Sequence, residues 1–370
     1  MKILHIGKFH PIRGGVEKVM LDLTEGLSGR GIECDMLCAA QRGSYTVTLN
    51  DHARILAVRT LARVKSTMLA PAMILRMRRI RHRYDIVHIH HPDPMAALAL
   101  RLSGFKGRVV LHWHSDILRQ RQLLRLVRPL QSWLLKRADA VVGTSPVYLS
   151  ESKWLTEVQH KCTCIPIGIV APEAAPPEAV EAVRQRYGNR RIVFAMGRLV
   201  SYKGFEYLID AARLLPDGYV VVIGGTGPLE KSLRERIDAD GVSTKVVLAG
   251  RIPDDELSAH YQAADLFCLS SVERTEAFGV VQIEVMACGT PVVATTIEGS
   301  GVAWVNAHGQ SGLNVPPRDP EALAAAITAV SEDRERYAAE ALRRFKTHFT
   351  SEKMLDKTVT LYKQLLNKRP

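Results

Sequence analysis

The sequence predicts an α/β protein of two doubly wound, Rossmann-like domains that face each other across a cleft. Its 370 residues are enough for two domains, each with its own core. Apolar runs of strand length alternate with helical patterns along nearly the whole chain, which indicates parallel sheets covered on both faces. The Ala- and Pro-rich stretch APEAAPPEAVEAV, residues 171–183, interrupts this alternation once and reads as a linker. Sheets of this kind bind ligands at the carboxyl ends of their strands.

Residues 1–170 form the first predicted domain. Its expected strands are KILHIG (2–7), ECDMLCA (33–39), RILAV (54–58), YDIVHIH (84–90), RVVLHWH (108–114), ADAVVGT (138–144) and CTCIPIG (162–168). Helical patterns follow two of them, at 16–31 and 94–104.

Residues 171–350 form the second predicted domain, in which the alternation restarts. The expected strands are RIVFAMG (191–197), YVVVIGG (219–225), KVVLAG (245–250), DLFCLSS (265–271) and PVVATT (291–296). The expected helices lie at 205–215, 229–237, 255–264, 280–288 and 321–330. A last helix within 351–370 closes the chain and can cross back to the first domain.

Charge is spread unevenly along the chain. Of the formal net charge of +12, residues 1–170 contribute 26 basic and 12 acidic residues, and residues 171–370 contribute 24 and 26. The segments 59–83 and 119–130 mix Arg with Leu, Met and Ile at near-helical spacing, which is typical of basic helices on an anionic membrane surface. A solvated helix face with its own core contacts explains the pattern equally well. Nucleic acid is not the expected partner, because the segments lack interleaved aromatic residues and any known reader motif.

The chain shows no sign of secretion or of crossing a membrane. No apolar run reaches the roughly 18 residues of a membrane span, and the first ten residues read as a strand and not as a signal peptide. The six cysteines lie in apolar segments and form no CxxC pair, which fits reduced thiols in a cytosol. We therefore expect a cytoplasmic protein, resting on the cytoplasmic face of the inner membrane.

Two loops of the second domain follow predicted strands and suit phosphate binding. In GRLVSYKG, Arg198 and Lys203 lie between Gly197 and Gly204, just before a helix whose N-terminus attracts anions. The loop GGTGP, 224–228, is weak evidence by itself, since glycine also serves ordinary turns. It is not a P-loop, and no acidic residue stands where NAD binding requires one.

A pair of glutamates marks a third loop and the helix after it. Glu276 precedes the predicted helix VVQIEVMAC and Glu284 lies within it, with Gly279 between them. Carboxylates in such apolar surroundings are costly unless they bind something. They suit the hydroxyls of a ribose and of a sugar; the alternative is an ion pair with Arg274 or Arg251.

The first domain offers a glycine loop, PIRGGVEKV (11–19), and several histidines. His112 and His114 in HWHSD share one face of a strand, and together with His88, His90 and His91 they raise the possibility of a metal site. No carboxylate or thiol completes such a set. We expect most of these histidines to be satisfied in the core, with His114 in the site.

These motifs together resemble the large family of retaining glycosyltransferases of GT-B fold called family 4. The resemblance rests on EAFGVVQIEVMACGTPVV with its two glutamates, on GRLVSYKG, GGTGP, RGGVEK and HWHSD in the same order, and on 300–327. It covers nearly the full chain. One departure is Ala277, where many members have glycine.

The resemblance implies a role for each motif residue. Catalytic roles fall to Glu276, facing the transferred sugar, to Arg198 and Lys203 on the donor diphosphate, and to His114 near the reacting carbon. Donor binding is implied for Gly14, Gly15, Gly197, Gly227, Phe278, Gly279 and Glu284, the last on the ribose hydroxyls. The first domain is then the acceptor side and the second binds the nucleotide sugar. No metal ion or other cofactor is expected, because Arg198 and Lys203 supply the positive charge.

The implied function is transfer of a hexose, of mannose or glucose/GlcNAc type, from a GDP- or UDP-sugar to a lipid-linked or polysaccharide acceptor in cell-surface glycan synthesis. The rival interpretations are a sugar-nucleotide epimerase or hydrolase of the same fold and a non-enzymatic nucleotide-binding protein. An enzyme of the epimerase or hydrolase kind needs no acceptor.

Overall fold

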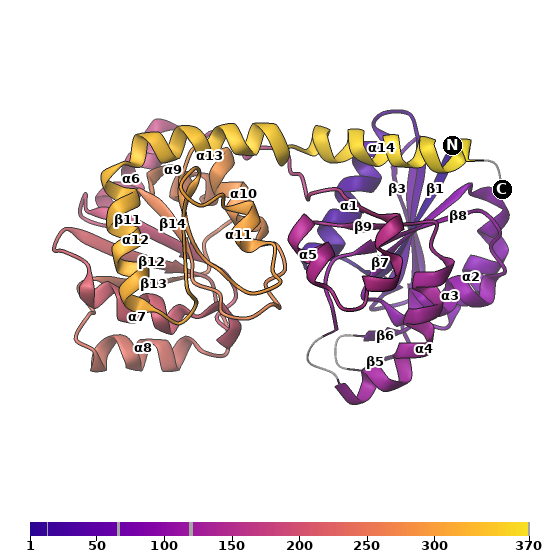
Figure 1. Cartoon of the computed structure of the whole chain (residues 1–370), viewed down its shortest axis with the longest axis horizontal. Coiled ribbons are helices and arrows are strands. Elements are labelled where there is room, and N and C mark those ends of the chain that lie inside the picture. The colour runs from indigo at the N-terminus through magenta and orange to yellow at the C-terminus, as the bar shows by residue number, and fades with distance from the viewer. Residues whose placement is uncertain (13, 65–66, 118–120, 369–370) are drawn as a thin grey trace. The chain divides into compact units, whose positions relative to one another are not determined.

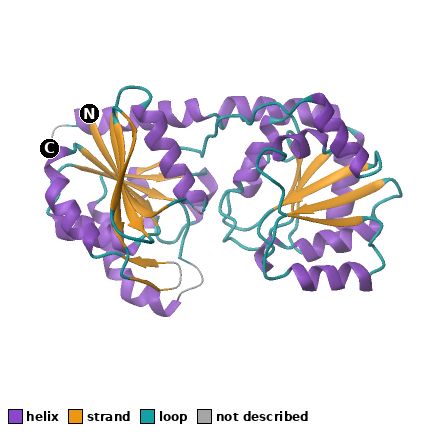
Figure 2. Ribbon diagram, turned by 180° about the vertical axis from the view of Figure 1, so that it is seen from behind, coloured by secondary structure: helices purple, strands orange, loops and turns teal. Residues whose placement is uncertain are grey.

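The chain divides by its internal contacts into two compact units, each built on its own sheet (Figures 1 and 2). The computed structural model describes residues 1–12, 14–64, 67–117 and 121–368. Unit 1 comprises Met1–Ile167 and the segment from Ser351 onward, and unit 2 comprises Gly168–Thr350. In both units, helices cover the two faces of the sheet (Figure 2).

Unit 1 has an eight-stranded sheet in the order β10-β9-β8-β7-β1-β2-β4-β3. Its strands are β1 (Lys2–His10), β2 (Glu33–Ala40), β3 (Tyr45–Asn50), β4 (Ala53–Arg59), β7 (Ile86–His91), β8 (Arg108–Trp113), β9 (Ala140–Gly143) and β10 (Cys162–Cys164). All neighbouring strands are parallel except β3, which pairs antiparallel with β4. A separate hairpin joins β5 (Ala62–Val64) and β6 (Thr67–Leu69).

The helices of unit 1 include one that arrives from the far end of the sequence. They are α1 (Gly15–Ser28), α2 (Ala72–Ile80), α3 (Pro94–Ser103), α4 (Arg121–Arg137), α5 (Pro146–Glu151) and α14 (Ser351–Asn367). Helix α14 packs beside α1 (Figure 1). Arg30 donates hydrogen bonds to Glu352 and Asp356 of α14, and Leu355, Tyr362 and Leu365 are buried in unit 1. The helix is therefore part of the core of unit 1.

Unit 2 has a six-stranded, all-parallel sheet in the order β13-β12-β11-β14-β15-β16. Its strands are β11 (Arg191–Met196), β12 (Tyr219–Gly224), β13 (Val246–Gly250), β14 (Leu266–Leu269), β15 (Val292–Thr295) and β16 (Gly312–Val315). Its helices are α6 (Pro177–Arg186), α7 (Phe205–Leu214), α8 (Glu230–Ala239), α9 (Leu257–Ala263), α10 (Val280–Ala287), α11 (Val302–Val305), α12 (Pro320–Glu332) and α13 (Arg334–His348).

The structure departs from the sequence prediction at several elements. The predicted linker 171–183 ends inside a helix, because α6 begins at Pro177; proline fits the first helical turn and Ala and Glu favour the rest. Strands β3 and β16 and helix α13 were not predicted. Helix α13 buries only Tyr337, Ala341 and Phe345, a stripe too narrow to stand out among its charges.

The two basic segments are not continuous helices on an open surface. Residues 59–83 contain the end of β4, the β5–β6 hairpin, α2 and a 3-10 turn. Met73, Met77 and Ile80 of α2 are buried in the core of unit 1, so the apolar side of this helix mainly serves the fold. Residues 121–130 begin α4, whereas the prediction for 119–120, and for the side chains up to 126, lies outside the described residues.

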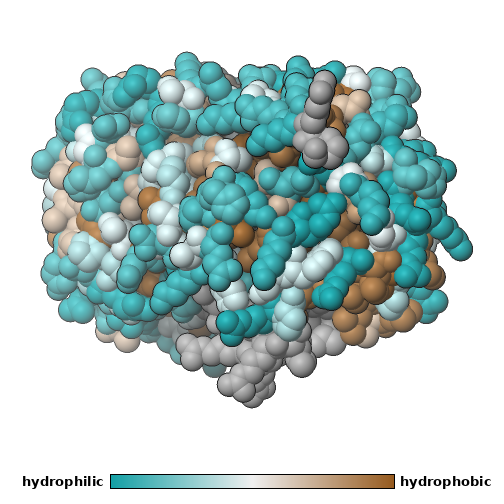
Figure 3. Space-filling model, turned by 45° about the vertical axis from the view of Figure 1, so that its right-hand side comes forward, coloured by the Kyte–Doolittle hydropathy of each residue, from teal (hydrophilic) through white to brown (hydrophobic). Residues whose placement is uncertain are grey.

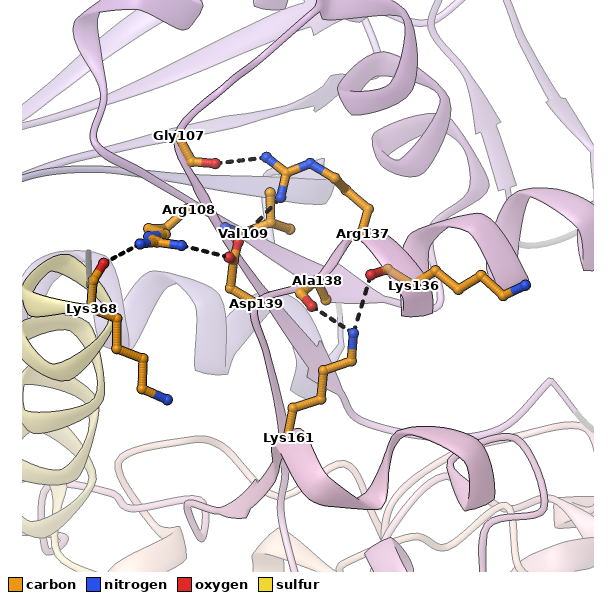
Figure 4. A network of polar contacts seen from close by, with 9 residues as sticks. All are labelled: Gly107, Arg108, Val109, Lys136, Arg137, Ala138, Asp139, Lys161 and Lys368. Carbon is orange, nitrogen blue, oxygen red and sulfur yellow. Dashed lines mark hydrogen bonds and ion pairs between the residues drawn. The ribbon is translucent and has the colours of Figure 1, made fainter. Parts of the chain in front are cut away.

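The amino edge of the unit 1 sheet uses its charges for structure (Figure 4). Asp139 accepts hydrogen bonds from Arg108 and Arg137, both at 3.1 Å, and from the amide of Val109 at 2.8 Å. Lys161 donates to the carbonyls of Lys136 and Ala138, and burial lowers the pKa of its ammonium group. Three of the basic residues of this unit therefore stabilise the ends of its strands.

Among the described residues, no helix is both long and apolar enough to cross a bilayer. None of the six cysteines is in a disulfide. Burial raises the pKa of the Cys38 and Cys268 thiols to about 12, so both are protonated near neutral pH.

Candidate active site

The strand order of unit 2 locates its candidate site at the carboxyl edge between β11 and β14. The chain proceeds from β11 to β12 and β13 on one side and then continues with β14, β15 and β16 on the other. Such a reversal separates the loops after the two central strands and leaves room for a ligand. The loop 197–204 follows β11 and the loop 270–279 follows β14. These are the two segments that the sequence assigned to phosphate and sugar.

Lys203 and Glu276 form an ion pair at this reversal point. The Nζ atom of Lys203 lies 2.5 Å from Oε2 of Glu276, and both side chains are nearly buried, with 11% and 13% exposure. Ser271 donates a second hydrogen bond to the same Oε2 atom at 3.2 Å, and the Ser300 hydroxyl donates to the backbone carbonyl of Glu276. The partner of Glu276 is thus a lysine from the neighbouring loop. Arg198, by contrast, is exposed.

Glycines let the loops around this pair come close together. A Cβ on Gly197 would lie 3.0 Å from Cε of Lys203, and one on Gly227 would lie 2.4 Å from the carbonyl oxygen of Leu199. Gly204 has a φ of +64° and faces the Ser270 carbonyl, where a Cβ would be 2.3 Å away. The GGTGP loop therefore supports the 197–204 loop by packing against it. This contact accounts for Gly227 without any ligand, and donor binding by Gly227 remains a prediction.

Helix α10 starts at the same edge. Gly279 caps its N-terminus with a φ of +74°, a left-handed conformation that favours glycine. Phe278 is buried and packs edge-on against Phe349, with ring centroids 6.0 Å apart. The side-chain amide of Gln282 donates to the Phe278 carbonyl at 3.1 Å. The backbone amide of Gln282 also donates to the Gly279 carbonyl at 2.9 Å, so both the side chain and the backbone of Gln282 hold the turn in place.

Glu284 is held by a tyrosine that the sequence analysis did not identify. The hydroxyl of Tyr261, on α9, donates to Oε2 of Glu284 at 2.8 Å. Burial and the Glu284 charge raise the pKa of this tyrosine, so it stays a donor. Tyr261 and Glu284 lie on different helices, 23 residues apart in the sequence. No sequence motif marks such a contact, which is why it was not predicted.

Unit 1 shows the corresponding reversal between β1 and β7. Gly14 and Gly15 follow β1 and begin α1. A Cβ built on Gly15 would meet no heavy atom of the described residues within 4 Å, so the space above this helix start is open. At the same edge, Asp93 after β7 accepts hydrogen bonds from the Lys8 amide and from two amides of α3. The carboxylate thereby joins the ends of β1 and β7.

Five histidines lie on one face of the three central strands of unit 1. His5 on β1 is opposite His88 on β7, and His90 on β7 is opposite His112 on β8; His114 directly follows β8. The rings of His112 and His114 stack at 4.0 Å, which confirms that they share a face. The Nδ1 atom of His88 lies 2.5 Å from the hydroxyl of Tyr362 on α14.

All five rings are neutral near pH 7. Burial lowers the pKa of His5 and of His112 to about 3 and holds the pKa of the other three well below the usual value. The prediction that most of His88, His90, His91, His112 and His114 are satisfied in the core is wrong in part. All five are buried. However, both ring nitrogens of His112 and the Nε2 atoms of His88 and His91 lack a hydrogen-bond partner among the described residues, as does Nε2 of His5.

The histidines are close enough to hold a metal ion in two sets of three. Their geometry does not favour this role. The lone pair of an imidazole nitrogen lies in the ring plane, and neighbouring planes differ by only 14° for His112 and His114 and 29° for His90 and His112. Lone pairs in such parallel rings point side by side and do not converge on the tetrahedral positions that zinc needs.

Rossmann-like units with polar groups at the reversal point of the sheet are typical of proteins that bind nucleotide-type ligands. Family comparisons give the class. Residues 178–347 match the model of glycosyl transferases group 1, and residues 13–173 match that of glycosyltransferase family 4. The chain is 32% identical to O-antigen chain mannosyltransferase C of Escherichia coli over all of both chains. It is also 32% identical to D-rhamnosyltransferase WbpZ of Pseudomonas aeruginosa, over 88% of this chain and 86% of that one.

Solved structures agree on the fold. The chain superposes on sucrose-phosphate synthase from Thermosynechococcus elongatus with a TM-score of 0.80 and 22% identity, covering 100% of both chains. It superposes on Anabaena HepE in complex with UDP with a TM-score of 0.78 and 21% identity, over 98% and 100%. The chain belongs to the group 1, family 4 glycosyltransferases, with the GT-B fold, and is a glycosyltransferase.

The structure brings some of the predicted site residues together. Lys203, Glu276 and Gly197 meet in unit 2, with Phe278 and Gly279 on the same loop and Glu284 on the helix that follows it. In unit 1, Gly14, Gly15 and His114 each follow a central strand at its carboxyl end. Tyr261, Ser300 and His5 could not be identified from the sequence, because the partner of each is distant in the sequence. Ser271 was also not identified, although its partner Glu276 lies in the same loop.

Proposed function

We propose that the protein is a retaining hexosyltransferase that moves a sugar of mannose or glucose/GlcNAc type from a GDP- or UDP-sugar to a lipid-linked or polysaccharide acceptor. The Lys203–Glu276 pair at the reversal point of the unit 2 sheet is the observation that carries this proposal. The names of its relatives, an O-antigen mannosyltransferase, a rhamnosyltransferase and a GDP-mannose-dependent phosphatidylinositol monomannoside mannosyltransferase, support a role in cell-surface glycan synthesis. Retention of configuration rests on the family resemblance.

In the proposed mechanism, charged side chains stabilise the opposite charges that develop in the transition state. As the bond from the anomeric carbon to the diphosphate breaks, negative charge grows on the leaving phosphate and positive charge on the sugar ring. Arg198 is exposed and able to grip the diphosphate, and Lys203 exchanges part of its contact with Glu276 for a phosphate oxygen. Glu276 then faces the sugar. We propose that these two cations replace a metal ion, so that no cofactor is required.

Glu284 holds the ribose in this proposal. Its Oε2 atom is fixed by Tyr261, so the carboxylate is oriented before the donor arrives. In this proposal the backbone amides at the turn of Phe278 and Gly279 bind the diphosphate, and Gly14 and Gly15 at the start of α1 are further donor-binding residues. His114 contacts the donor sugar.

Lys203→Ala tests the assignment. We expect transfer to fall by roughly 100- to 1000-fold, the loss typical for one group that stabilises developing charge, with magnesium having no effect on the unsubstituted enzyme. Lys245→Ala is the matched control, because Lys245 is also a half-buried lysine of unit 2, paired with Asp217 and the Leu215 carbonyl away from the site. Equal loss in both variants would contradict the assignment.

The donor and the rival functions are separated by two measurements. A thermal-shift screen of UDP-, GDP- and ADP-sugars, with and without magnesium, identifies the donor, since a bound ligand raises the unfolding temperature. Rapid loss of the donor without any acceptor would favour a hydrolase or epimerase. Donor binding that Lys203→Ala merely weakens, with no transfer by either protein, would favour a non-enzymatic binder. The anomeric configuration of the product, compared with that of the donor, shows directly whether the reaction retains configuration.

We also propose that unit 1 rests on the anionic cytoplasmic face of the inner membrane. Four of the exposed large apolar side chains, Leu61, Leu69, Leu75 and Leu102, belong to the hairpin, α2 and α3, and α3 packs against both β6 and α2.

Exposed arginines lie beside these leucines at 78, 79, 81 and 83, and within the described residues no carboxylate forms an ion pair with them. Figure 3, in which the side of unit 1 comes forward, shows hydrophobic surface beside hydrophilic surface. Apolar and basic groups together are what an anionic bilayer surface binds.

Neutralising these four arginines to glutamine tests the membrane proposal. We expect affinity for vesicles with anionic lipid to fall roughly tenfold or more, with no change in transfer to a soluble acceptor. The control neutralises exposed Lys231 and Arg234 of unit 2. Unchanged binding to anionic vesicles after the arginine substitutions would show that this surface is not the membrane contact.

A further inference from the structure

A chain of three hydrogen-bonded histidines crosses the centre of the unit 1 sheet and ends at His114. The Nδ1 atom of His5 lies 2.8 Å from Nε2 of His90, and Nδ1 of His90 lies 3.0 Å from Nε2 of His114. In both pairs the ring centroids are 5.2 Å apart. This separation is too large for face-to-face contact and fits rings joined edge to edge. The three residues come from β1, β7 and the end of β8, adjacent strands of one sheet.

One proton per ring gives this chain a direction. Each neutral imidazole has one N–H and one accepting nitrogen, and the burial described above keeps all three rings neutral. His90 uses both of its nitrogens in the chain, so it donates one bond and accepts the other. Both bonds therefore point the same way. Either all three rings carry the proton on Nδ1, or all three carry it on Nε2.

The environment of the two ends selects between these states. Nε2 of His5 is buried and has no partner among the described residues, and a buried N–H without an acceptor is the least tolerated kind of unpaired group. The Nδ1 state avoids this, because it leaves only a lone pair at that position. At the other end, His114 follows β8 at the carboxyl edge and keeps 6% of its surface exposed. A proton on its Nδ1 can there meet water or a ligand.

We infer that His5 and His90 are positioning residues that hold His114 in the Nδ1–H form, so that it presents a hydrogen-bond donor to an oxygen of the sugar donor. A histidine in water favours the Nε2–H form, so the chain reverses the ordinary preference. The identity of the bonded partner commonly decides which nitrogen of a functional histidine carries the proton. The inference rests on the proposed function only for what His114 contacts. The state of the chain is independent of it.

Nitrogen NMR of the unsubstituted protein, labelled with ¹⁵N in its histidines, tests the state of the chain without any substrate. The correlations between ring nitrogens and ring protons distinguish the two tautomers. We expect His5, His90 and His114 all to be in the Nδ1–H form at pH 7.5. Opposite tautomers in His5 and His90, or Nε2–H in all three, would overturn the inference. Signals that shift when a chelator removes trace metal would also overturn it, since the rings would then be metal ligands.

A pair of matched variants tests the effect on His114. His90→Phe removes both hydrogen bonds but keeps a ring in the stack. His112→Phe is the control, because His112 is equally buried and stacks on His114 but forms no hydrogen bond within the described structure. We expect His90→Phe to return His114 to the Nε2–H form and to lower kcat by roughly 10- to 100-fold, the loss typical for a residue that orients a functional histidine, with the KM for acceptor unchanged.

The outcomes separate the inference from the proposed function. A tautomer change in His90→Phe with equal losses of kcat in both variants would overturn the role of the chain in catalysis. An unchanged His114 tautomer in His90→Phe would overturn the chain itself. Absence of any sugar transfer by the unsubstituted enzyme would refute the proposed function, while the NMR result on the unsubstituted chain would still stand.

Discussion

The two units share one plan, a parallel sheet with polar groups at its reversal point, but they hold those groups in opposite electrostatic states. In unit 2 a lysine and a glutamate form an ion pair, and an exposed arginine lies close by in sequence. In unit 1 the central strands carry histidines that burial keeps neutral. The unit with the larger net positive charge thus carries neutral histidines on its central strands. The net charge of a unit therefore says little about the charge at its site, because basic side chains of unit 1 lie on its surface and at the amino edge of its sheet.

Acidification is expected to separate the two units most strongly. The folded-state pKa of His5, His91 and His112 is about 3, whereas an unfolded histidine titrates near 6.5. Above pH 6.5 neither state binds the proton and the full stability is present. As the pH falls below 6.5 the unfolded state alone gains protons, and at pH 5 each such histidine costs unit 1 about 2 kcal/mol.

Hydrogen exchange at pH 7.5 and pH 5, corrected for intrinsic rates, measures this difference. Amides of β1, β7 and β8 should lose protection at pH 5, while those of β11, β12 and β14 keep it. In unit 2, burial also lowers the pKa of His260. Equal loss in both units would mean that the buried histidines do not govern acid stability.

A pair of glycine substitutions contrasts the two units next. Gly227→Ala should destabilise unit 2 by about 1–3 kcal/mol, because its methyl would collide with the backbone of Leu199. Gly15→Ala should leave the unfolding temperature of unit 1 unchanged, since the space there is open, but should raise the KM for the donor. A thermal melt and a transfer assay of both variants suffice. A Gly15→Ala protein with normal kinetics would mean that no ligand approaches the start of α1.

The smallest expected effect comes from removing one hydroxyl in each unit. Tyr261→Phe deletes the hydrogen bond to Glu284, worth about 1 kcal/mol, and should raise the KM for the donor roughly fivefold with little change in kcat. Tyr362→Phe deletes the bond to His88 in unit 1 and should leave the donor KM alone. If both variants shift the donor KM alike, Tyr261 does not act through Glu284.

The sequence predicted the parallel strands of both units because their apolar runs are long and continuous. It failed where an element buries little: β3 is an edge strand with alternating exposure, and α13 buries one narrow stripe. Among site residues, Lys203 and Glu276 could be named from their motifs, but not their mutual contact, because the contact depends on β11 and β14 being neighbours. The hydrogen-bonded chain of His5, His90 and His114 could not be predicted from the sequence for the same reason. His5 stands in an ordinary apolar strand and gains its partner only from the strand order.

The placement of α14 affects how the protein folds during its synthesis on the ribosome. Residues 351–367 complete unit 1, yet they are synthesised after all of unit 2. A nascent chain can finish unit 2 while unit 1 still lacks the helix that covers His88 through Tyr362. The earlier-made half of the enzyme is therefore the later one to mature, and a chain stopped before residue 351 would leave an apolar, histidine-lined surface open to aggregation.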